Sequence, residues 1–498
     1  MYPDRDLDLE GAPPWNALEL AQDLELPTVF KAMCGDDKFL YEVSKRVVFA
    51  SESDVETIRY RQAILGDCLR HPEALHAMYA IAVEAEEGKR GYYWISSGRF
   101  PSSMLTSAVG LLEFYVEILR KLRKTTDASA NLFESDGLRK LCATLSDELS
   151  DEYFDVVEAH LKQLRFRGGA LVSAQLGSGN KAVNYVLRRP KREGRNWFER
   201  LFGSGYEEYT FNLHPRDESG ARALSELRDR GVNLVANATA QASDHILSFL
   251  KLLRAELGFY VACVNLYAAL AERGMPVCFP DAGVASARSH RFTGLYDVSL
   301  ALIMQNRVVA NDLDADGSAA VIITGANRGG KSVFLRSIGL AQLMMQAGMF
   351  VGAEEFAANV CTGLYTHYKR EEDASMKSGK FDEEVERISE IASHLEPNAM
   401  ILFNESLAAT NDREGSEIAR QIVTALLDKR IKVFYVTHLY EFAHTLLQQS
   451  EHKVTFLRAE RQPDGSRTFK LIEASPLETS YGEDLYNEIF PEAREQPV

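Results

Sequence analysis

The feature that most constrains this chain is the stretch from Val321 to Ser332, which reads Val-Ile-Ile-Thr-Gly-Ala-Asn-Arg-Gly-Gly-Lys-Ser. It starts with a β-branched run that is typical of a buried strand. The part from Gly325 onwards fits the spacing G-x-x-x-x-G-K-[ST], which predicts a phosphate-binding loop when it lies between a strand and a helix. Apolar residues recur at helical spacing after Ser332, so this context is present. We therefore expect a strand, a loop and a helix that bind the phosphates of a nucleotide.

The residue types in this loop suit contact with phosphate. Glycines allow backbone N–H groups to curl around phosphate oxygens without a Cβ in the way. Lys331 supplies a positive charge, the Ser332 hydroxyl can bind Mg²⁺, and the following helix points its N-terminus at the anion. The residues expected to contact the nucleotide are Gly325, Ala326, Asn327, Arg328, Gly329, Gly330, Lys331, Ser332 and Val333.

A second apolar run, from Ala399 to Phe403, ends in the polar pair Asn404 and Glu405. In a phosphate-binding fold the first residue after such a strand helps to hold Mg²⁺, and the second orients the attacking water. Asn404 offers an uncharged oxygen, so we expect weak metal binding and slow turnover. Glu405 keeps the charge that a general base needs. The simpler alternative is that Glu405 is a surface acid after a core strand.

A third strand is expected from Val433 to Val436, and Thr437 and His438 follow it. A histidine at this edge can reach the γ-phosphate or order the water, although a plain hydrogen-bonding role is the alternative. Polar residues at 410–415 precede a further helix and suit a helix cap. They also suit a surface that touches the nucleotide of a second subunit.

The N-terminal half of the chain has a different pattern. Three prolines within the first 20 residues suggest a loose leader, and the pattern from about 24 to 165 is helical. Short strand-like runs follow, and helical spacing of apolar residues returns from about 218 to 272. We therefore expect a helical region at 1–284 with a β-rich insertion at about 170–215, and a nucleotide-binding domain at 285–498.

A basic segment from Arg188 to Arg200 lies within this insertion and is interleaved with aromatic residues. Such a segment suits contact with a nucleic-acid backbone, and a solvated hairpin loop explains it equally well. The formal net charge of −16 argues against a chain that coats nucleic acid through bulk charge. It does not exclude DNA as a partner, because binding follows local patches.

The cysteines and the apolar stretches bear on location. Six cysteines are scattered without a C-x-x-C pair, which indicates reduced thiols and neither a disulfide framework nor a zinc site. The longest uncharged apolar stretch, from Leu257 to Leu270, is too short to span a bilayer. We expect a cytoplasmic protein with no membrane partner.

These motifs resemble the ATPase domain of the MutS family of DNA mismatch-repair proteins. The family pattern T-G-x-N-x-G-G-K-S is reproduced from Thr324 to Ser332. Residues 311–313 resemble the family's N-D-L, residues 437–442 its T-H-Y-x-E-L, and residues 480–482 its S-Y-G. The resemblance extends weakly to the helical half, where residues 58–64 resemble the start of the family's core domain.

The resemblance implies an α/β P-loop NTPase domain of the ABC type, C-terminal to a mostly α-helical core and lever domain with a small β-rich insertion. It implies ATP and Mg²⁺ as ligands, with Ser332 and Asn404 as metal ligands. Glu405 is implied as the catalytic base and His438 as the catalytic residue that senses the γ-phosphate. It also implies a homodimer whose nucleotide state sets its grip on DNA.

Several positions depart from the family pattern. Asn404 stands where the family has aspartate. The family's trans-acting S-T-F aligns with residues 379–381, so its serine is either displaced to Ser378 or absent, and Lys380 supplies a cation near the partner's γ-phosphate. The chain begins almost at the helical core, so we expect no N-terminal domain that reads mismatches.

We therefore expect an ATP-hydrolysing, dimeric clamp on duplex or branched DNA that acts in repair or recombination. One alternative is an ATP-dependent clamp on structured RNA or the ribosome. A second alternative is a weakly hydrolysing nucleotide sensor or scaffold, which the uncharged Asn404 and the net charge favour.

Overall fold

A computed structural model of the chain describes residues 1–8, 10–93, 100–167, 169–188, 212–214, 216–304, 307–370 and 379–478. These residues form two compact units. The sheet unit comprises Met1–Leu75, Leu132–Arg139 and Ala255–Val498, and the helical unit comprises His76–Asn131 and Lys140–Arg254. The expected boundary near residue 284 does not coincide with this division, because the first helices and the end of the long helix α10 fold with the sheets.

The larger sheet of the sheet unit has six strands in the order β12-β11-β6-β10-β9-β8. The strands are β6 (Ala320–Gly325), β8 (Leu364–Tyr368), β9 (Met400–Asn404), β10 (Lys432–Val436), β11 (Val454–Arg461) and β12 (Arg467–Glu473). All neighbours pair in parallel except β12, which is antiparallel to β11. The three strands predicted for the nucleotide-binding domain are β6, β9 and β10, and they lie side by side.

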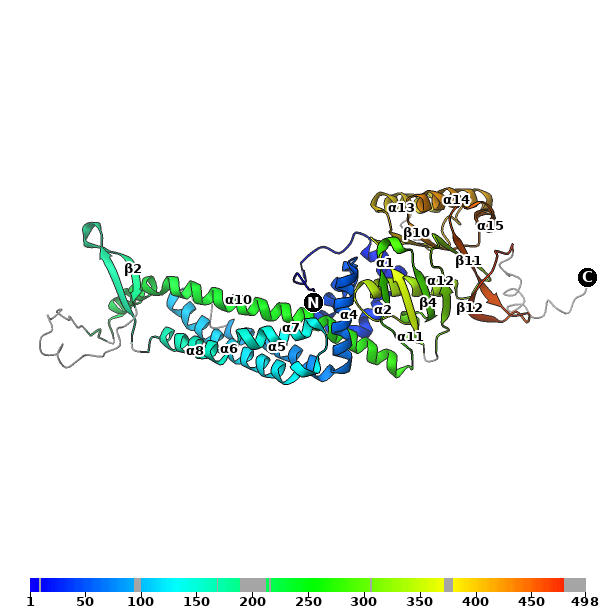
Figure 1. Cartoon of the computed structure of the whole chain (residues 1–498). Coiled ribbons are helices and arrows are strands. Elements are labelled where there is room, and N and C mark those ends of the chain that lie inside the picture. The colour runs from blue at the N-terminus through cyan, green and yellow to red at the C-terminus, as the bar shows by residue number, and fades with distance from the viewer. Residues whose placement is uncertain are drawn as a thin grey trace, which may run out of the picture. The chain divides into compact units, whose positions relative to one another are not determined.

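Helices cover both faces of this sheet (Figure 1). They are α12 (Lys331–Gln346), α13 (Lys380–His394), α14 (Asp412–Asp428) and α15 (Tyr440–Gln449). Apolar residues of α13, α14 and α15 share one buried core with alternate residues of the central strands, which places these helices on one face. Helix α12 packs on β9 and β10 from the other face and is buried along most of its length. Burial on both faces explains the continuous apolar runs in the sequence.

A second sheet has four strands in the order β3-β7-β4-β5. The strands are β3 (Asp281–Gly283), β4 (His290–Leu295), β5 (Asn311–Asp314) and β7 (Glu355–Asn359), with the short helices η3 (Ala285–Ala287) and α11 (Val298–Ile303) between them. The side chain of Asp297 accepts a hydrogen bond from the Leu300 N–H and so caps α11. The expected combination of mixed α/β sheets with a helical region is confirmed.

The N-terminal segment is packed, so the expectation of a loose leader is wrong. It forms α1 (Ala17–Asp23), α2 (Leu26–Cys34), α3 (Lys38–Ala50) and α4 (Val55–Arg70). Met1 and Leu7 are buried, and the Asn16 side chain donates a hydrogen bond of 2.9 Å to the carbonyl oxygen of Leu364 on β8. The prolines of this segment gave a wrong prediction because its side chains are buried by residues that lie far along the chain.

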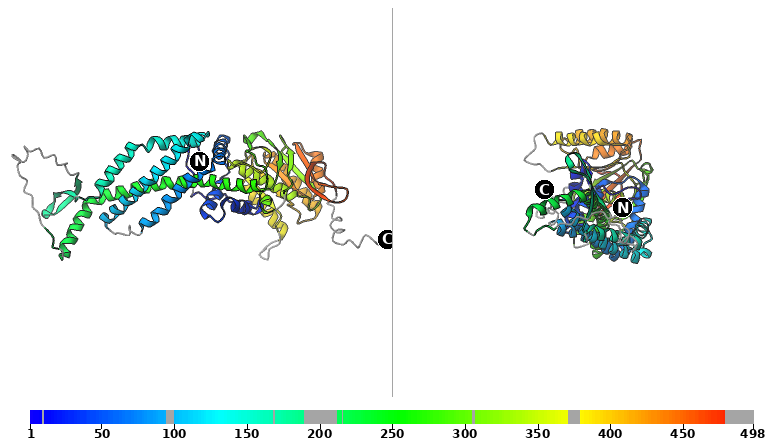
Figure 2. Two further views of the ribbon diagram at one scale, coloured as in Figure 1. Left: turned by 90° about the horizontal axis from the view of Figure 1, so that it is seen from below. Right: turned by 90° about the vertical axis from the view of Figure 1, so that its left-hand side faces the viewer.

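The helical unit is built from long helices (Figures 1 and 2). They are α5 (Pro72–Tyr93), α6 (Pro101–Ser129), α8 (Asp151–Leu164) and α10 (Glu218–Glu272), with η1 (Ala130–Leu132) and α7 (Asp136–Glu148) between α6 and α8. Ion pairs join them, from Arg254 on α10 to Glu86 on α5 at 2.6 Å and from Arg120 on α6 to Glu158 on α8 at 2.7 Å.

The helix that includes α6, Pro101–Leu132, is long and apolar enough to cross a membrane by length and composition. Half of its most apolar window is buried within the protein, as it is in a core helix of a helix bundle.

The β-rich insertion begins with an antiparallel hairpin of β1 (Leu171–Leu176) and β2 (Ala182–Arg188), which turns through η2 (Ser178–Asn180). Both strands were predicted, and Gly179 supplies the left-handed turn residue with φ of +71°. The basic segment from Arg188 to Arg200 lies outside the described residues except for Arg188. Most of residues 208–213, the last of the strand-like runs expected in the insertion, also lie outside them.

A substitution at Leu24 tests whether the N-terminal segment contributes to the stability of the fold. It is completely buried, and the space above Gly339 on α12 is filled by its side chain. Leu24→Ala should lower the free energy of unfolding by about 2–5 kcal/mol, as cavity-forming substitutions do. Leu18→Ala is the matched control, because Leu18 lies on α1 but is 78% exposed, and it should change stability by less than about 0.5 kcal/mol. Equal, small effects in denaturant unfolding would contradict the packing of this segment.

Candidate functional site

The loop between β6 and α12 has a backbone shape that favours glycine at two positions. Gly325 has φ of +106°, and a Cβ placed there would lie 2.8 Å from the backbone nitrogen of Ala459 on β11. Gly330 has φ of +87° and immediately precedes α12. Left-handed backbone is strained for residues that carry a side chain. The glycine spacing in the sequence therefore has a direct structural cause.

Lys331 is the first residue of α12, and its side chain turns back into this loop. Its ammonium group is buried and donates hydrogen bonds to the carbonyl oxygens of Gly325 and Ala326, both at 3.0 Å. Burial lowers the pKa of Lys331 to about 8, against the opposing effect of the Glu405 carboxylate. Neutral carbonyl oxygens compensate a buried positive charge only in part. An anion that enters the loop would therefore gain a strong electrostatic partner.

Ser332 and Asn404 meet at the carboxyl edge of the sheet. The Ser332 hydroxyl, at the start of α12, donates a hydrogen bond of 2.9 Å to the Oδ1 atom of Asn404, the last residue of β9. Hydroxyl and amide oxygens are hard ligands of the kind that Mg²⁺ accepts, so the pair fits this metal. Within the described ranges, no group of three or more His, Cys, Asp or Glu side chains is arranged to hold a metal ion. A metal here would therefore depend largely on uncharged protein oxygens.

Glu405 and His438 form a hydrogen-bonded pair beside the loop. The Nε2 atom of His438 donates to Oε1 of Glu405 at 3.0 Å, and the two side chains are 30% and 33% exposed. This hydrogen bond is the largest influence on the Glu405 carboxyl, whose pKa lies below its usual value in spite of burial. The carboxylate is thus ionised and partly open to water, as a general base must be.

The backbone turn after Glu405 is strained and is held by buried hydrogen bonds. Glu405 and Leu407 have φ of +54° and +61°, which is uncommon for residues with side chains. The Ser406 hydroxyl donates to the carbonyl oxygen of His367 at 2.7 Å, and the Tyr435 hydroxyl donates to the carbonyl oxygen of Ser406 at 2.8 Å. This network sets the direction in which the Glu405 side chain leaves β9. Sequence reasoning missed it, because its members follow or lie on three separate strands and share no local pattern.

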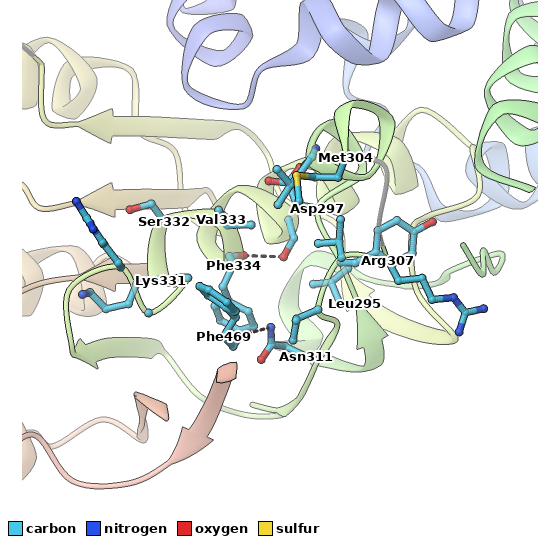
Figure 3. Close-up of a pocket in the computed structure, with 18 of the residues that line it drawn as sticks. Leu295, Asp297, Met304, Arg307, Asn311, Lys331, Ser332, Val333, Phe334 and Phe469 are labelled. Atoms are coloured by element: carbon cyan, nitrogen blue, oxygen red, sulfur yellow. Dashed lines mark hydrogen bonds between the residues drawn. The ribbon is translucent and has the colours of Figure 1, made fainter. Parts of the chain in front are cut away.

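A cavity of about 500 Å³ lies against the loop. Figure 3 shows Lys331 and Ser332 on one side of it, and Leu295, Met304 and Arg307 on the other. Its apolar lining consists of Leu295, Tyr296, Leu300, Met304, Val308, Val309, Val333, Phe334 and Phe469. A polar loop that faces an apolar wall suits a ligand with phosphates at one end and a ring system at the other.

Phe469 was not selected from the sequence, although it lines this cavity from β12. Its carbonyl oxygen accepts a hydrogen bond of 3.4 Å from the Asn311 side chain, whose Oδ1 atom accepts from the Leu471 N–H at 2.8 Å. Asn311, which belongs to the N-D-L motif, thus binds β12 to the cavity wall. The pairing of β12 with β11 and the Asn311 hydrogen bonds bring Phe469 to the loop, so no signal near Phe469 in the sequence identifies it.

The structure brings most of the predicted nucleotide residues together. Residues 327–333 and Glu405 line the cavity, and Gly325 and Ala326 bind the Lys331 ammonium group. Asn404 and His438 join the group through the Ser332 and Glu405 hydrogen bonds.

Two further predictions have different outcomes. Lys380 begins α13 and does not line the cavity that the structure describes, and Ser378 lies outside the described residues. Within 410–415, the Asn411 side chain accepts a hydrogen bond of 3.0 Å from the Glu414 N–H. This segment therefore caps α14, which was one of the two roles expected for it.

Comparisons with known proteins point to one family. The sequence model of the MutS2 N-terminal domain matches residues 53–273, and that of MutS domain V matches residues 321–490. The DNA mismatch repair protein MutS of Thermus aquaticus is 30% identical over 177 residues, which are 36% of this chain and 22% of that protein. Endonuclease MutS2 of Streptococcus equi subsp. equi is 35% identical over 141 residues, which are 28% of this chain and 18% of that protein.

MutS protein homolog 4 of Mus musculus is 31% identical over 137 residues, or 28% of this chain and 14% of that protein. The matched region therefore spans less than a quarter of each of these relatives. The two domain models together cover well over half of the chain, in the order helical region first and sheet region second. With its glycine-lysine loop, its strand-edge residues and both of these matches, the chain belongs to the MutS family.

Proposed function

We propose that this chain binds and hydrolyses ATP and that its nucleotide state controls a clamp on DNA. The observation that carries the proposal is the grouping of Lys331, the Ser332–Asn404 pair and the Glu405–His438 pair at one edge of the sheet. Parallel strands end at the same edge, so the residues that follow β6, β9 and β10 meet there. In this proposal the domain is a P-loop NTPase of the ABC type.

The phosphates of ATP bind the loop in this proposal. Lys331 exchanges its carbonyl partners for phosphate oxygens, and the N-terminus of α12 adds its backbone N–H groups and its dipole. The base enters the apolar part of the cavity, next to Met304 and Phe469.

Ser332 and Asn404 are the residues that would hold Mg²⁺. When bound, the metal neutralises part of the negative charge of the phosphates. Because Asn404 is uncharged where the family carries aspartate, we expect metal binding to be weak and turnover slow.

Glu405 acts as the general base in the proposed hydrolysis. Its carboxylate accepts a proton from the attacking water, while the hydrogen bond from His438 holds it in place. The strained turn around Ser406 supports this role. Its buried hydrogen bonds hold the strained backbone in place and so fix the direction of the Glu405 side chain.

The site is completed by a second copy of the chain in our proposal. Lys380 begins α13, outside the cavity that the described residues line, and in this proposal it serves the partner of a homodimer. Ser378 and residues 410–415 are the other candidates for contact with the partner's nucleotide. ATP then stabilises the dimer, which gives a nucleotide-dependent switch.

DNA is the proposed partner, as duplex or branched DNA in repair or recombination. Relatives of this chain carry names of DNA mismatch repair proteins. The basic segment from Arg188 to Arg200 supplies backbone contacts, which act without reading base sequence. We propose a cytoplasmic location.

A second candidate function is a nucleotide sensor or scaffold that hydrolyses ATP weakly. The uncharged Asn404 favours it, because it removes one of the charged metal ligands that support rapid hydrolysis. ATP binding would then be retained while turnover is negligible.

Glu405→Gln tests the hydrolysis. The variant should bind ATP as the wild type does but hydrolyse it about 10²- to 10⁴-fold more slowly, since it loses a positioned base. Phosphate release and the binding of a fluorescent ATP analogue are the two measurements. Unchanged turnover in the variant would disprove the role of Glu405, and negligible turnover in the wild type with intact binding would favour the sensor.

The affinity for ATP should depend on pH through Lys331. The free protein has a Lys331 pKa of about 8, below the 10.5 of an unperturbed lysine, and phosphates bind the protonated form. Below pH 8 the charge is already present, whereas above pH 8 binding must take up a proton, so affinity should fall by up to about tenfold per pH unit. Lys331→Arg is the control, because arginine does not titrate in this range and its affinity should stay level between pH 7 and 9.5. A level profile in the wild type would contradict the role of Lys331.

DNA binding should depend on charge and not on mismatches. Homoduplex and single-mismatch duplex should bind alike, with a log–log salt slope of about −0.9 per phosphate neutralised. The joint substitution of Arg188, Arg189, Lys191 and Arg192 by Ala should weaken binding to all DNA substrates and flatten this slope. Joint substitution of the exposed residues Lys31, Lys38, Arg59 and Lys429 by Ala removes the same charge and should have little effect. Clear preference for a mismatch, or equal losses in both variants, would contradict the proposal.

A further inference from the structure

The junction between α1 and α2 lies in a part of the chain that neither family model matches, since the matched ranges begin at residues 53 and 321. Only Leu24 and Glu25 separate the two helices. Glu25 has φ of +50°, a left-handed conformation that is costly for a residue with a side chain. A strained residue at a short junction persists only where its surroundings hold it.

The Glu25 carboxylate is held by a charged network that leads to the cavity. It accepts a hydrogen bond from Arg336 on α12, and the same guanidinium group donates through Nε to Asp297. Asp297 is completely buried, whereas Glu25 is 44% exposed, so Arg336 links a surface carboxylate to an interior one. Burial raises the pKa of Asp297, and the Arg336 guanidinium opposes this shift.

Asp297 in turn holds helix α11. Its Oδ1 atom accepts the Leu300 N–H at 3.0 Å, and Leu300 and Met304 form part of the cavity wall. The junction also touches α11 directly, because the Ser299 hydroxyl lies 3.4 Å from the carbonyl oxygens of both Leu24 and Glu25. Displacement of the junction would therefore release the apolar wall of the cavity.

The other side of the junction contacts the sheet edge. Asp23, the last residue of α1, is buried and pairs with Arg370 at 2.8 Å. Arg370 lies two residues after β8, and the N–H of the intervening Lys369 donates to the carbonyl oxygen of Asn404 at 3.0 Å. Asp23 and the junction thus contact both the apolar wall and the segment after β8 that is bonded to Asn404.

We infer that the α1–α2 junction is a strut that positions the wall of the nucleotide cavity, with Glu25 as its positioning residue. Glu25 acts through Arg336 and Asp297 and does not touch the ligand. The identity of that ligand as ATP rests on the proposed function. The ion-pair geometry and the position of α11 are independent of the proposed function.

The test compares Glu25→Gln with the wild type in two measurements. Hydrogen exchange of the α11 amides, without nucleotide, should become faster in the variant, because Arg336 is no longer held from the Glu25 side. The KM for ATP should rise about fivefold or more with a smaller change in kcat, as for coupling between a remote residue and a binding site. Glu25→Asp, which keeps the charge, should restore part of both values.

Asp36→Asn is the matched control. Asp36 pairs with Lys31 just beyond the end of α2, and both side chains are exposed. This variant loses one ion pair of the same segment but none that leads to the cavity, so exchange in α11 and the KM should stay at wild-type values.

The outcomes separate the strut from the proposed function. Unchanged α11 exchange in Glu25→Gln, or equal acceleration in Asp36→Asn, overturns the strut. Faster exchange in Glu25→Gln alone supports it, even if the wild type fails to bind ATP, and that failure would overturn only the proposed function. Faster exchange with an unchanged KM in a protein that binds ATP overturns the link to the cavity wall.

Discussion

The buried ammonium group of Lys331 is the interaction on which the candidate site depends. It is held by two carbonyl oxygens of its own loop, and this requires the backbone to turn sharply at Gly325 and Gly330. Neutral oxygens leave much of its charge uncompensated, which is why burial moves the Lys331 pKa so far. The loop therefore holds a positive charge that is only partly compensated, beside the cavity that Lys331 lines. The N-terminal end of the α12 dipole adds to the same positive field.

The parallel sheet brings the other residues of the candidate site next to this loop. Register places Asn404 beside Val436 and Val436 beside Ile323, so the residues that follow these strands leave the sheet at one edge. The Ser332–Asn404 and Glu405–His438 hydrogen bonds follow from that alignment. A shift of β9 by one residue would turn Asn404 toward the opposite face and leave Ser332 without this partner, because side chains alternate along a strand.

The N-terminal helices give the sheet unit a second set of constraints. Salt bridges at Asp23 and Glu25 involve partly or fully buried groups, where loss of one partner leaves an uncompensated charge. Such contacts fix the positions of the helices more strongly than the exposed ion pairs of the same segment do, because water screens the exposed pairs. The walls of the cavity are therefore supported from outside the regions that define the family.

Local sequence patterns were sufficient to predict the loop, the strands β6, β9 and β10, the long helix α10 and the hairpin of β1 and β2. They also identified Lys331, Ser332, Asn404, Glu405 and His438, because each follows directly from a strand, a glycine spacing or both. The apolar wall, the Ser406 network and the role of residues 1–34 were decided only by tertiary structure. Phe469, Met304 and Leu300 reach the loop through strand pairing and helix packing between distant segments. In the Glu25–Arg336–Asp297 network, Glu25 meets residues that lie hundreds of positions further along the chain. Burial and charge compensation arise from such long-range contacts, so the order of residues along the chain carries no local sign of them.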